Sequence, residues 1–193
     1  YHRSAIMNRA TGLGKMLAVG LAAEACAAFV QPPAERGAVA AVNSAASCVL
    51  SGEQRALESV AAAIRAAHPD AFVKFMPVDY AFHSPQMDAL ARELGDKVRQ
   101  LNLHPTTTTE PTGEQQVPVM YSTLTGRKVG AGAELTAEYW ATQVRQPVLF
   151  ARAVEAAMDD GRADVFVELA PHPVLAYYVR EAAAARKLGA KDC

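Results

Sequence analysis

The sequence predicts an α/β protein. Short apolar runs typical of buried strands alternate with amphipathic helix patterns, and glycine and proline separate them. In the first half the order is strand, helix, strand, strand, helix, strand. Of 193 residues, 51% are hydrophobic and 20% are charged, a composition that suits a packed core and argues against disorder. The length fits one domain, or one domain with a subdomain.

The composition also argues against several partners. The net charge is -1 and no polybasic patch is visible, so neither nucleic acid nor a membrane surface is expected as a partner. The three cysteines are odd in number and widely spaced, so neither a disulfide framework nor a metal site is expected. A reducing, cytoplasmic location is the default. The apolar stretch at 16–30 is interrupted by Glu24 and is too short to span a membrane.

The first half of the sequence is organised as a small subdomain. Residues 1–10 are predicted to be helical, and the subdomain follows them. The long helix of the subdomain should begin at a capping box over 51–54 and end at Pro69. The strand and helix order is that of a ferredoxin-like βαββαβ unit. Its expected strands are 15–21, 38–43, 47–50 and 72–79, and its short first helix is 22–30.

The second half is expected to alternate helices and strands, which implies an α/β layer. Ser84 and Pro85 should begin a helix, and Thr136 should cap another. A further helix should run from Pro147 to Gly161, and a C-terminal helix should follow Pro173. The expected strands are 117–122 and 163–169, and a polar loop is expected at 104–116.

One histidine has a position suited to catalysis. His83 ends the strand–loop segment that follows the fourth strand and directly precedes a helix N-terminus. Functional groups gather at strand ends in α/β layers. The positive end of a helix disfavours an imidazolium, which leaves the neutral ring that a general base needs. A capping or surface histidine without a catalytic role is the alternative. His172 is interpreted as structural.

Five ordered motifs, spread over nearly the whole chain, resemble one family. Together they resemble the acyltransferase domains of polyketide synthases, relatives of bacterial malonyl-CoA:acyl carrier protein transacylases. The resemblance implies an α/β-hydrolase-like core interrupted by a ferredoxin-like insertion. Residues 1–13 and 80–193 would belong to the core, and 14–79 to the insertion. The motifs are 41–44 with 49–52, 78–87, 121–126, 139–140 with 144–148, and 167–175.

The resemblance also implies a nucleophile that this sequence lacks. The family uses a serine in a G-x-S-x-G turn, and no such motif occurs here. In the family that turn lies shortly upstream of the helix to which Arg3 would belong. We therefore expect the N-terminal part of the core, with the serine, to lie outside this chain, and residues 1–193 alone to be catalytically incomplete.

The resemblance assigns roles to individual residues. His83 would be the base, oriented by the backbone carbonyl of Gln143 in place of an acid. Arg3 would bind the free carboxylate of the substrate through its planar guanidinium, and an ordinary surface arginine is the alternative. Met7 and Asn43 would line the pocket. A core methionine and a turn-stabilising asparagine are the alternatives for these two residues.

The residues before the histidine bear on the acyl group. In the family, HAFH goes with malonyl and YASH with methylmalonyl. This chain has Tyr80 from one pattern and Phe82 from the other. Because a large Phe82 should fill the space that an α-methyl group would need, we expect malonyl.

The leading hypothesis is an acyltransferase that loads malonyl from malonyl-CoA onto the phosphopantetheine thiol of an acyl carrier protein. The route would be a Ser-His ping-pong mechanism without a bound metal or cofactor. Adjacent ketosynthase and linker domains would be further partners. The alternatives are an inactive structural or docking module, a methylmalonyl-specific transferase, and a ferredoxin-like ligand-binding module. The last explains residues 15–79 but not the motifs from His83 onward.

Overall fold

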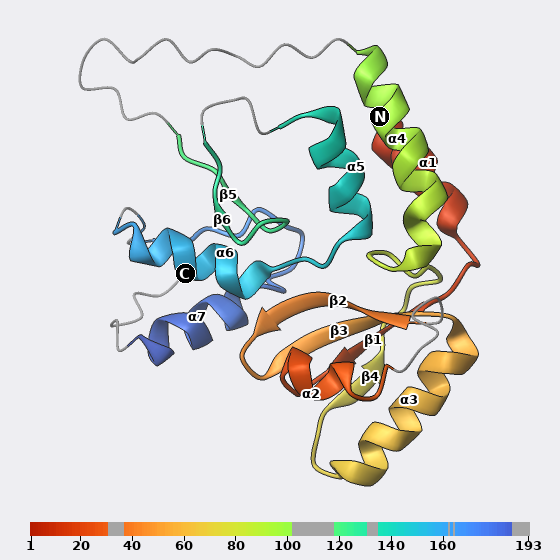
Figure 1. Cartoon of the computed structure of the whole chain (residues 1–193). Coiled ribbons are helices and arrows are strands. Elements are labelled where there is room, and N and C mark those ends of the chain that lie inside the picture. The colour runs from red at the N-terminus through yellow and green to blue at the C-terminus, as the bar shows by residue number, and fades with distance from the viewer. Residues whose placement is uncertain (31–36, 102–117, 131–134, 162, 164, 187–193) are drawn as a thin grey trace.

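The computed structural model describes residues 1–30, 37–101, 118–130, 135–161, 163 and 165–186 (Figure 1). The predicted loop at 104–116 lies outside this part of the chain. The strands are β1 (Lys15–Val19), β2 (Gly37–Ser44), β3 (Ser47–Gly52), β4 (Val73–Phe75), β5 (Tyr121–Ser122) and β6 (Arg127–Lys128). The helices are α1 (His2–Met7), α2 (Ala23–Ala27), α3 (Gln54–Ala67), α4 (Asp88–Gln100), α5 (Ala137–Arg145), α6 (Phe150–Asp159) and α7 (Ala176–Ala185), with single 3-10 turns η1 (Asn8–Ala10) and η3 (Pro85–Met87).

The first half forms a four-stranded antiparallel sheet in the order β2-β3-β1-β4. This order confirms the predicted ferredoxin-like unit. In Figure 1 α2 and α3 lie below the sheet, while α4 and α5 lie above it. Leu57 and Ile64 of α3 are completely buried against Leu17 and Leu50 of the sheet. Burying each such side chain contributes about 1.5–3 kcal/mol.

The chain enters and leaves this unit at adjacent points. The N–H of Gly12 donates to the carbonyl of Asp79 at 2.6 Å, and Lys15 Nζ lies 3.0 Å from Asp79 Oδ1. Between them, a Cβ on Gly14 would lie 2.5 Å from the carbonyl oxygen of Gly52 and 2.8 Å from Ala81 Cβ. Only glycine fits there, so the backbone of the subdomain lies directly against the segment that carries His83.

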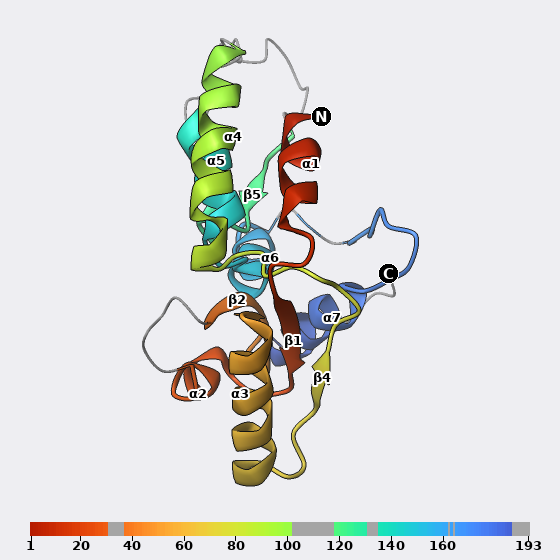
Figure 2. The same cartoon turned by 90° about the vertical axis from the view of Figure 1, so that its right-hand side faces the viewer.

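Helices α1 and α5 pack against α4. Figure 2 shows α1 beside α4, and their contact buries Ile6 and Met7 against Met87 and Leu94. On another side of α4, a Cβ on Gly95 would lie 3.2 Å from Ala141 Cβ, so α5 packs closely against α4. The helical caps predicted at Ser84 and Thr136 are confirmed, because their side chains accept from the N–H groups of Gln86 and Tyr139.

The predicted capping box is wrong. Ser51 and Gly52 continue β3, where they pair with Met16 and Lys15 of β1. The helix α3 has Glu53 at its N-cap, without a side-chain cap bond. The Ser51 hydroxyl is buried and has no hydrogen-bond partner among the described residues. Sheet pairing of Ser51 therefore outweighed its local preference for a helix cap.

The helix predicted from Pro147 begins later, at Phe150. The segment before it is extended and pairs in parallel with the edge of β2. The N–H of Val148 donates to the carbonyl of Ala40, and the N–H of Val42 donates to the carbonyl of Val148, both at 2.9 Å. An edge strand offers unpaired backbone groups, so pairing there replaces the first helical turn.

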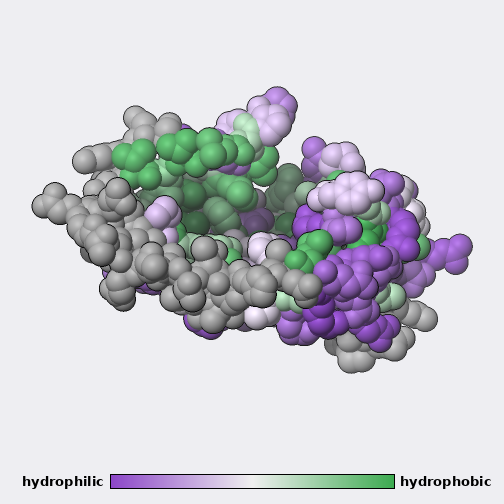
Figure 3. All heavy atoms as spheres, turned by 90° about the horizontal axis from the view of Figure 1, so that it is seen from above, coloured by the Kyte–Doolittle hydropathy of each residue, from purple (hydrophilic) through white to green (hydrophobic). Residues whose placement is uncertain are grey.

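The strand predicted at 163–169 is not formed in the part that the structure describes. Val165, Val167 and Leu169 are 63%, 75% and 95% exposed. A strand needs a hydrogen-bonded neighbour, and no described segment pairs with this one. Seen from above, hydrophobic residues gather on the half of the molecule away from α4 (Figure 3). No helix within the described ranges is long and apolar enough to cross a membrane.

Candidate active site around His83

A strained turn presents His83. Its φ angle is 62°, in the left-handed region, and it is the only non-glycine residue with positive φ in the described parts of the chain. Such backbone strain is held in place by surrounding structure and gathers at functional sites. The buried Ser84 supports the turn: its Oγ donates to the carbonyl of Ala81 at 2.7 Å and accepts from the N–H of Gln86 at 3.3 Å.

His83 forms hydrogen bonds with the C-terminal end of α5. The N–H of His83 donates to the carbonyl of Val144 at 3.3 Å, and Nδ1 lies 2.8 Å from the carbonyl oxygen of Gln146. A carbonyl can only accept, so Nδ1 carries the proton and the neutral ring has its lone pair on Nε2. This is the tautomer that a base acting through Nε2 requires.

The surroundings of His83 favour the neutral ring. Burial lowers the pKa of His83, the Gln146 carbonyl opposes this by accepting its hydrogen bond, and the charge of Arg3 lowers the pKa further. The Gln143 carbonyl is a weaker partner that acts in the same direction as Gln146. The net result is a pKa below the ordinary value of 6.5, which keeps the ring unprotonated near neutral pH.

The carbonyl that contacts His83 Nδ1 belongs to Gln146, whereas the family resemblance predicted Gln143 for this role. A signal for Gln146 was present, because it precedes Pro147, and a residue before proline is driven out of the helical region. Gln146 accordingly ends α5 in an extended conformation, with ψ at 158°. Its carbonyl therefore points away from the axis of α5 and lies within hydrogen-bond distance of His83 Nδ1. The role expected for the Gln143 carbonyl stays a prediction, and the Gln143 side-chain Oε1 is buried without a partner among the described residues.

Arg3 is close enough to His83 for its charge to act on the histidine ring. It is exposed on α1. Within the described residues its side chain makes neither an ion pair nor a hydrogen bond, whereas the side chain of Arg9 on the following turn is paired with Glu93. The Arg3 guanidinium is thus open to an anionic group near the histidine.

The other predicted pocket residues differ in burial. Met7 is buried in the hydrophobic cluster between α1 and α4. This burial is what the alternative interpretation, a core methionine, predicts. Tyr80 and Phe82 stack, with ring centroids 3.8 Å apart and planes at 17°. They contact both this cluster and the cluster on the sheet around Met16. The two rings therefore bridge the subdomain and the helices just before His83.

Asn43 is near the end of β2, half-buried and next to Val42, which bonds to Val148. It lies on the edge strand that joins the segment carrying Gln146, and its predicted role in lining the pocket stays a prediction. In the described ranges, no group of three or more histidine, cysteine, aspartate or glutamate side chains is arranged to hold a metal ion.

The architecture and the histidine turn define an α/β protein with a candidate base where its two parts meet. The model of the acyl transferase domain family matches residues 1–193, and the chain belongs to this family. It is 37% identical over 181 residues to the polyketide synthase GfsA of Streptomyces halstedii, covering 93% of this chain and 2% of the relative. It is 36% identical over 185 residues to the erythronolide synthase EryA2 of Saccharopolyspora erythraea, covering 93% of this chain and 5% of that one.

Solved structures agree with this assignment. The acyltransferase domain from module 8 of the salinomycin polyketide synthase matches with a TM-score of 0.80 and 32% identity, over 98% of this chain and 42% of that one. The malonyl CoA-acyl carrier protein transacylase from Clostridium perfringens matches in fold, with a TM-score of 0.77 and 24% identity, over 94% and 54%. The chain thus spans a small fraction of the curated relatives and under half of the salinomycin domain. The fold class is confirmed as part of an α/β-hydrolase-like core with a ferredoxin-like subdomain.

Proposed function

We propose that the protein transfers a malonyl extender unit from malonyl-CoA to the phosphopantetheine thiol of an acyl carrier protein. The partners are that carrier protein and the neighbouring ketosynthase and linker domains of a cytoplasmic synthase. The chemistry needs no metal or redox cofactor, because a thioester is exchanged first for an oxygen ester and then for a new thioester.

The proposed reaction has two halves. A serine supplied from outside these 193 residues attacks the malonyl thioester while His83 Nε2 takes its proton. The bond from the carbonyl carbon to the CoA sulfur breaks, and His83 returns the proton to that sulfur. In the second half His83 takes the proton of the carrier thiol, the sulfur attacks the acyl-serine, and the serine oxygen leaves with the proton.

The observation that carries the proposal is the contact between His83 Nδ1 and the Gln146 carbonyl at 2.8 Å. It supplies the orientation that an acid supplies in a Ser-His-Asp triad. A carbonyl bears no charge, so it stabilises the imidazolium less than a carboxylate would. The proposed assignment of Arg3 to the malonyl carboxylate rests on its exposed guanidinium and on its charge reaching the histidine.

The choice of malonyl rests on Phe82. Its ring is held by stacking on Tyr80 immediately before the base. A ring stacked on its neighbour cannot turn aside for an α-methyl group without losing this contact. Methylmalonyl is the competing substrate, since Tyr80 belongs to the pattern that goes with it.

The test uses the complete protein, because the proposed nucleophile is not in this chain. Equal amounts of malonyl-CoA, methylmalonyl-CoA and acetyl-CoA are supplied with carrier protein, and the acylated carrier is identified by intact mass. We expect malonyl carrier protein to dominate. A dominant methylmalonyl product would overturn the substrate assignment. Failure of all three donors to acylate enzyme or carrier would support an inactive structural module instead.

A further inference from the structure

His83 and the carbonyl that orients it come from separate segments. His83 precedes α4 by way of the short turn η3, and Gln146 directly follows α5. Their separation therefore depends on how the first turn of α4 sits against the last turn of α5. A displacement of about 1 Å in catalytic groups can lower a rate by about a hundredfold, so whatever holds these two helix ends together matters for the base.

An ion pair joins the two helix ends. Arg145, the last residue of α5, donates from Nε to Oδ1 of Asp88, the first residue of α4, at 2.6 Å. Arg145 is next to Gln146, and Asp88 is separated from His83 only by the η3 turn and Ser84. The arginine side chain is 28% exposed and the aspartate 56% exposed. Such a pair adds little to overall stability, because water screens it.

We propose that the Asp88–Arg145 ion pair is a positioning device that keeps the Gln146 carbonyl on His83 Nδ1. Neither residue touches the reacting atoms. The inference rests on the proposed acyl transfer only for its kinetic consequence, since the contact itself is a property of the fold.

A purely structural role is the competing explanation. Asp88 is in the first turn of α4 and Arg145 in the last turn of α5, so each also complements the dipole of its own helix. In that case, loss of the pair would weaken the helices without changing the histidine.

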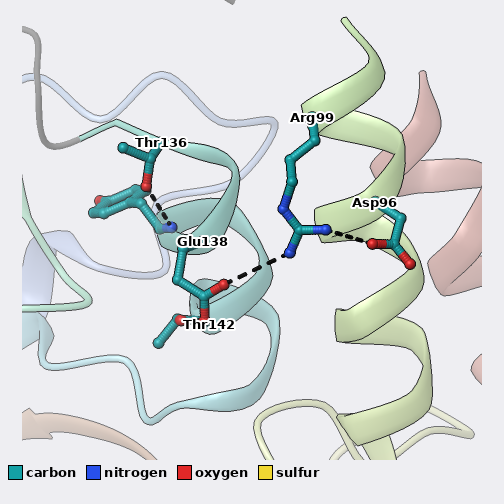
Figure 4. A network of polar contacts seen from close by, with 6 residues as sticks. Asp96, Arg99, Thr136, Glu138 and Thr142 are labelled. Atoms are coloured by element: carbon teal, nitrogen blue, oxygen red, sulfur yellow. Dashed lines mark hydrogen bonds and ion pairs between the residues drawn. The ribbon is translucent and has the colours of Figure 1, made fainter. Parts of the chain in front are cut away.

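The same two helices offer a matched control. At their other end Arg99 of α4 pairs with Asp96 and lies 3.9 Å from Glu138 of α5 (Figure 4). Asp88 and Arg99 are eleven positions apart, or roughly 16 Å along the helix at 1.5 Å per residue. Glu138 is likewise in the first turn of its helix. Its removal alters a cross-helix ion pair and a helix dipole but leaves the histidine end untouched.

The experiment compares D88N, R145Q and E138Q in the complete protein. For D88N and R145Q we expect kcat for acyl transfer to fall about ten- to a hundredfold. The KM for malonyl-CoA should stay within about twofold, because the pair binds no substrate. E138Q should keep kcat within about twofold. D88E and R145K, which retain the charges, should recover most of the rate, and they also serve if the first variants fold poorly.

A spectroscopic readout separates this inference from the proposed function. Long-range proton–nitrogen NMR on histidine-labelled protein reports which ring nitrogen of His83 carries the proton. We expect the Nδ1–H form in the unaltered protein and in E138Q, and a mixture with the Nε2–H form in D88N and R145Q. If D88N and R145Q keep the Nδ1–H form and the original kcat, or if E138Q loses as much as they do, the inference is overturned. If the unaltered protein transfers no acyl group, the proposed function fails while the ring signal still decides the role of the pair.

Discussion

The Nδ1 atom of His83 lies 2.8 Å from the carbonyl oxygen of Gln146. Two residues beyond Gln146, Val148 forms backbone hydrogen bonds with the edge strand β2. One extended segment therefore orients the histidine and joins the ferredoxin-like sheet to the helices. The candidate base is thus located where the two parts of the fold meet.

Replacement of His83 tests the proposed base directly. H83A in the complete protein should lower acyl-enzyme formation from malonyl-CoA by about 10²–10⁴-fold, because the nucleophile loses its proton acceptor. Intact-mass spectrometry after a short incubation measures it. The matched control is H172N, since His172 is an exposed loop residue and should have little effect. Near-normal acylation of H83A would rule out the assigned role.

The acid limb of the pH profile of kcat/KM should lie at unusually low pH. Because burial and Arg3 lower the pKa of His83, kcat/KM should fall only at a pH below the ordinary histidine value of 6.5. The variant R3Q removes a positive charge, so its acid limb should move to higher pH. R9Q, whose parent side chain is paired with Glu93, should leave the limb in place. An unchanged limb in R3Q would contradict the electrostatic contact. By linkage, protonation of His83 favours unfolding, so stability should decrease as the pH falls through about 6.5.

Arg3 should distinguish diacid from simple acyl donors. R3A is expected to reduce kcat/KM for malonyl-CoA roughly ten- to a hundredfold, the effect of one charged hydrogen-bonding partner. Acetyl-CoA has no free carboxylate, so its much lower rate should change little. Steady-state rates with both donors provide the comparison. Equal losses with the two donors would mean that Arg3 acts on folding or on the histidine alone.

Phe82 should control the α-substituent. F82S opens the space beside Tyr80, and the ratio of methylmalonyl to malonyl transfer should rise, by up to about 10–200-fold for one methyl group. Competition between the two CoA esters, read by the mass of the acylated carrier, measures this ratio. F72S is the matched control, because Phe72 is 59% exposed and lies directly before β4, away from the histidine turn. A ratio that stays constant in F82S would refute the steric assignment.

Two buried serines should respond in opposite ways to loss of the hydroxyl. Ser51 Oγ has no partner among the described residues, so S51A should leave the free energy of unfolding unchanged or raise it. Ser84 Oγ makes two hydrogen bonds, so S84A should cost about 1–3 kcal/mol. Urea unfolding of the complete protein measures both. If S51A costs as much as S84A, the Ser51 hydroxyl makes a stabilising hydrogen bond, which would contradict this prediction.

Local patterns in the sequence were sufficient for much of the fold. The strand and helix order predicted the ferredoxin-like sheet, and the Thr136 and Ser84 caps followed from short-range hydrogen bonding. His83 could be chosen from its place before a helix. The resemblance of the motifs, which the family match supports, named Arg3, Phe82 and the acyl-transfer chemistry.

Tertiary contacts decided the remainder. The local pattern at Ser51 predicted a helix cap, but pairing with Met16 across the sheet makes it a strand residue. Pro147 is compatible with a helix start, but Val148 is extended and forms backbone hydrogen bonds with the edge of β2 instead. That pairing places the Gln146 carbonyl on His83. The sequence by itself therefore determined the order of strands and helices in the subdomain, most of the remaining helices and which histidine to examine. Only the tertiary structure decided which carbonyl orients that histidine, because this depends on long-range backbone pairing that side-chain periodicity does not encode.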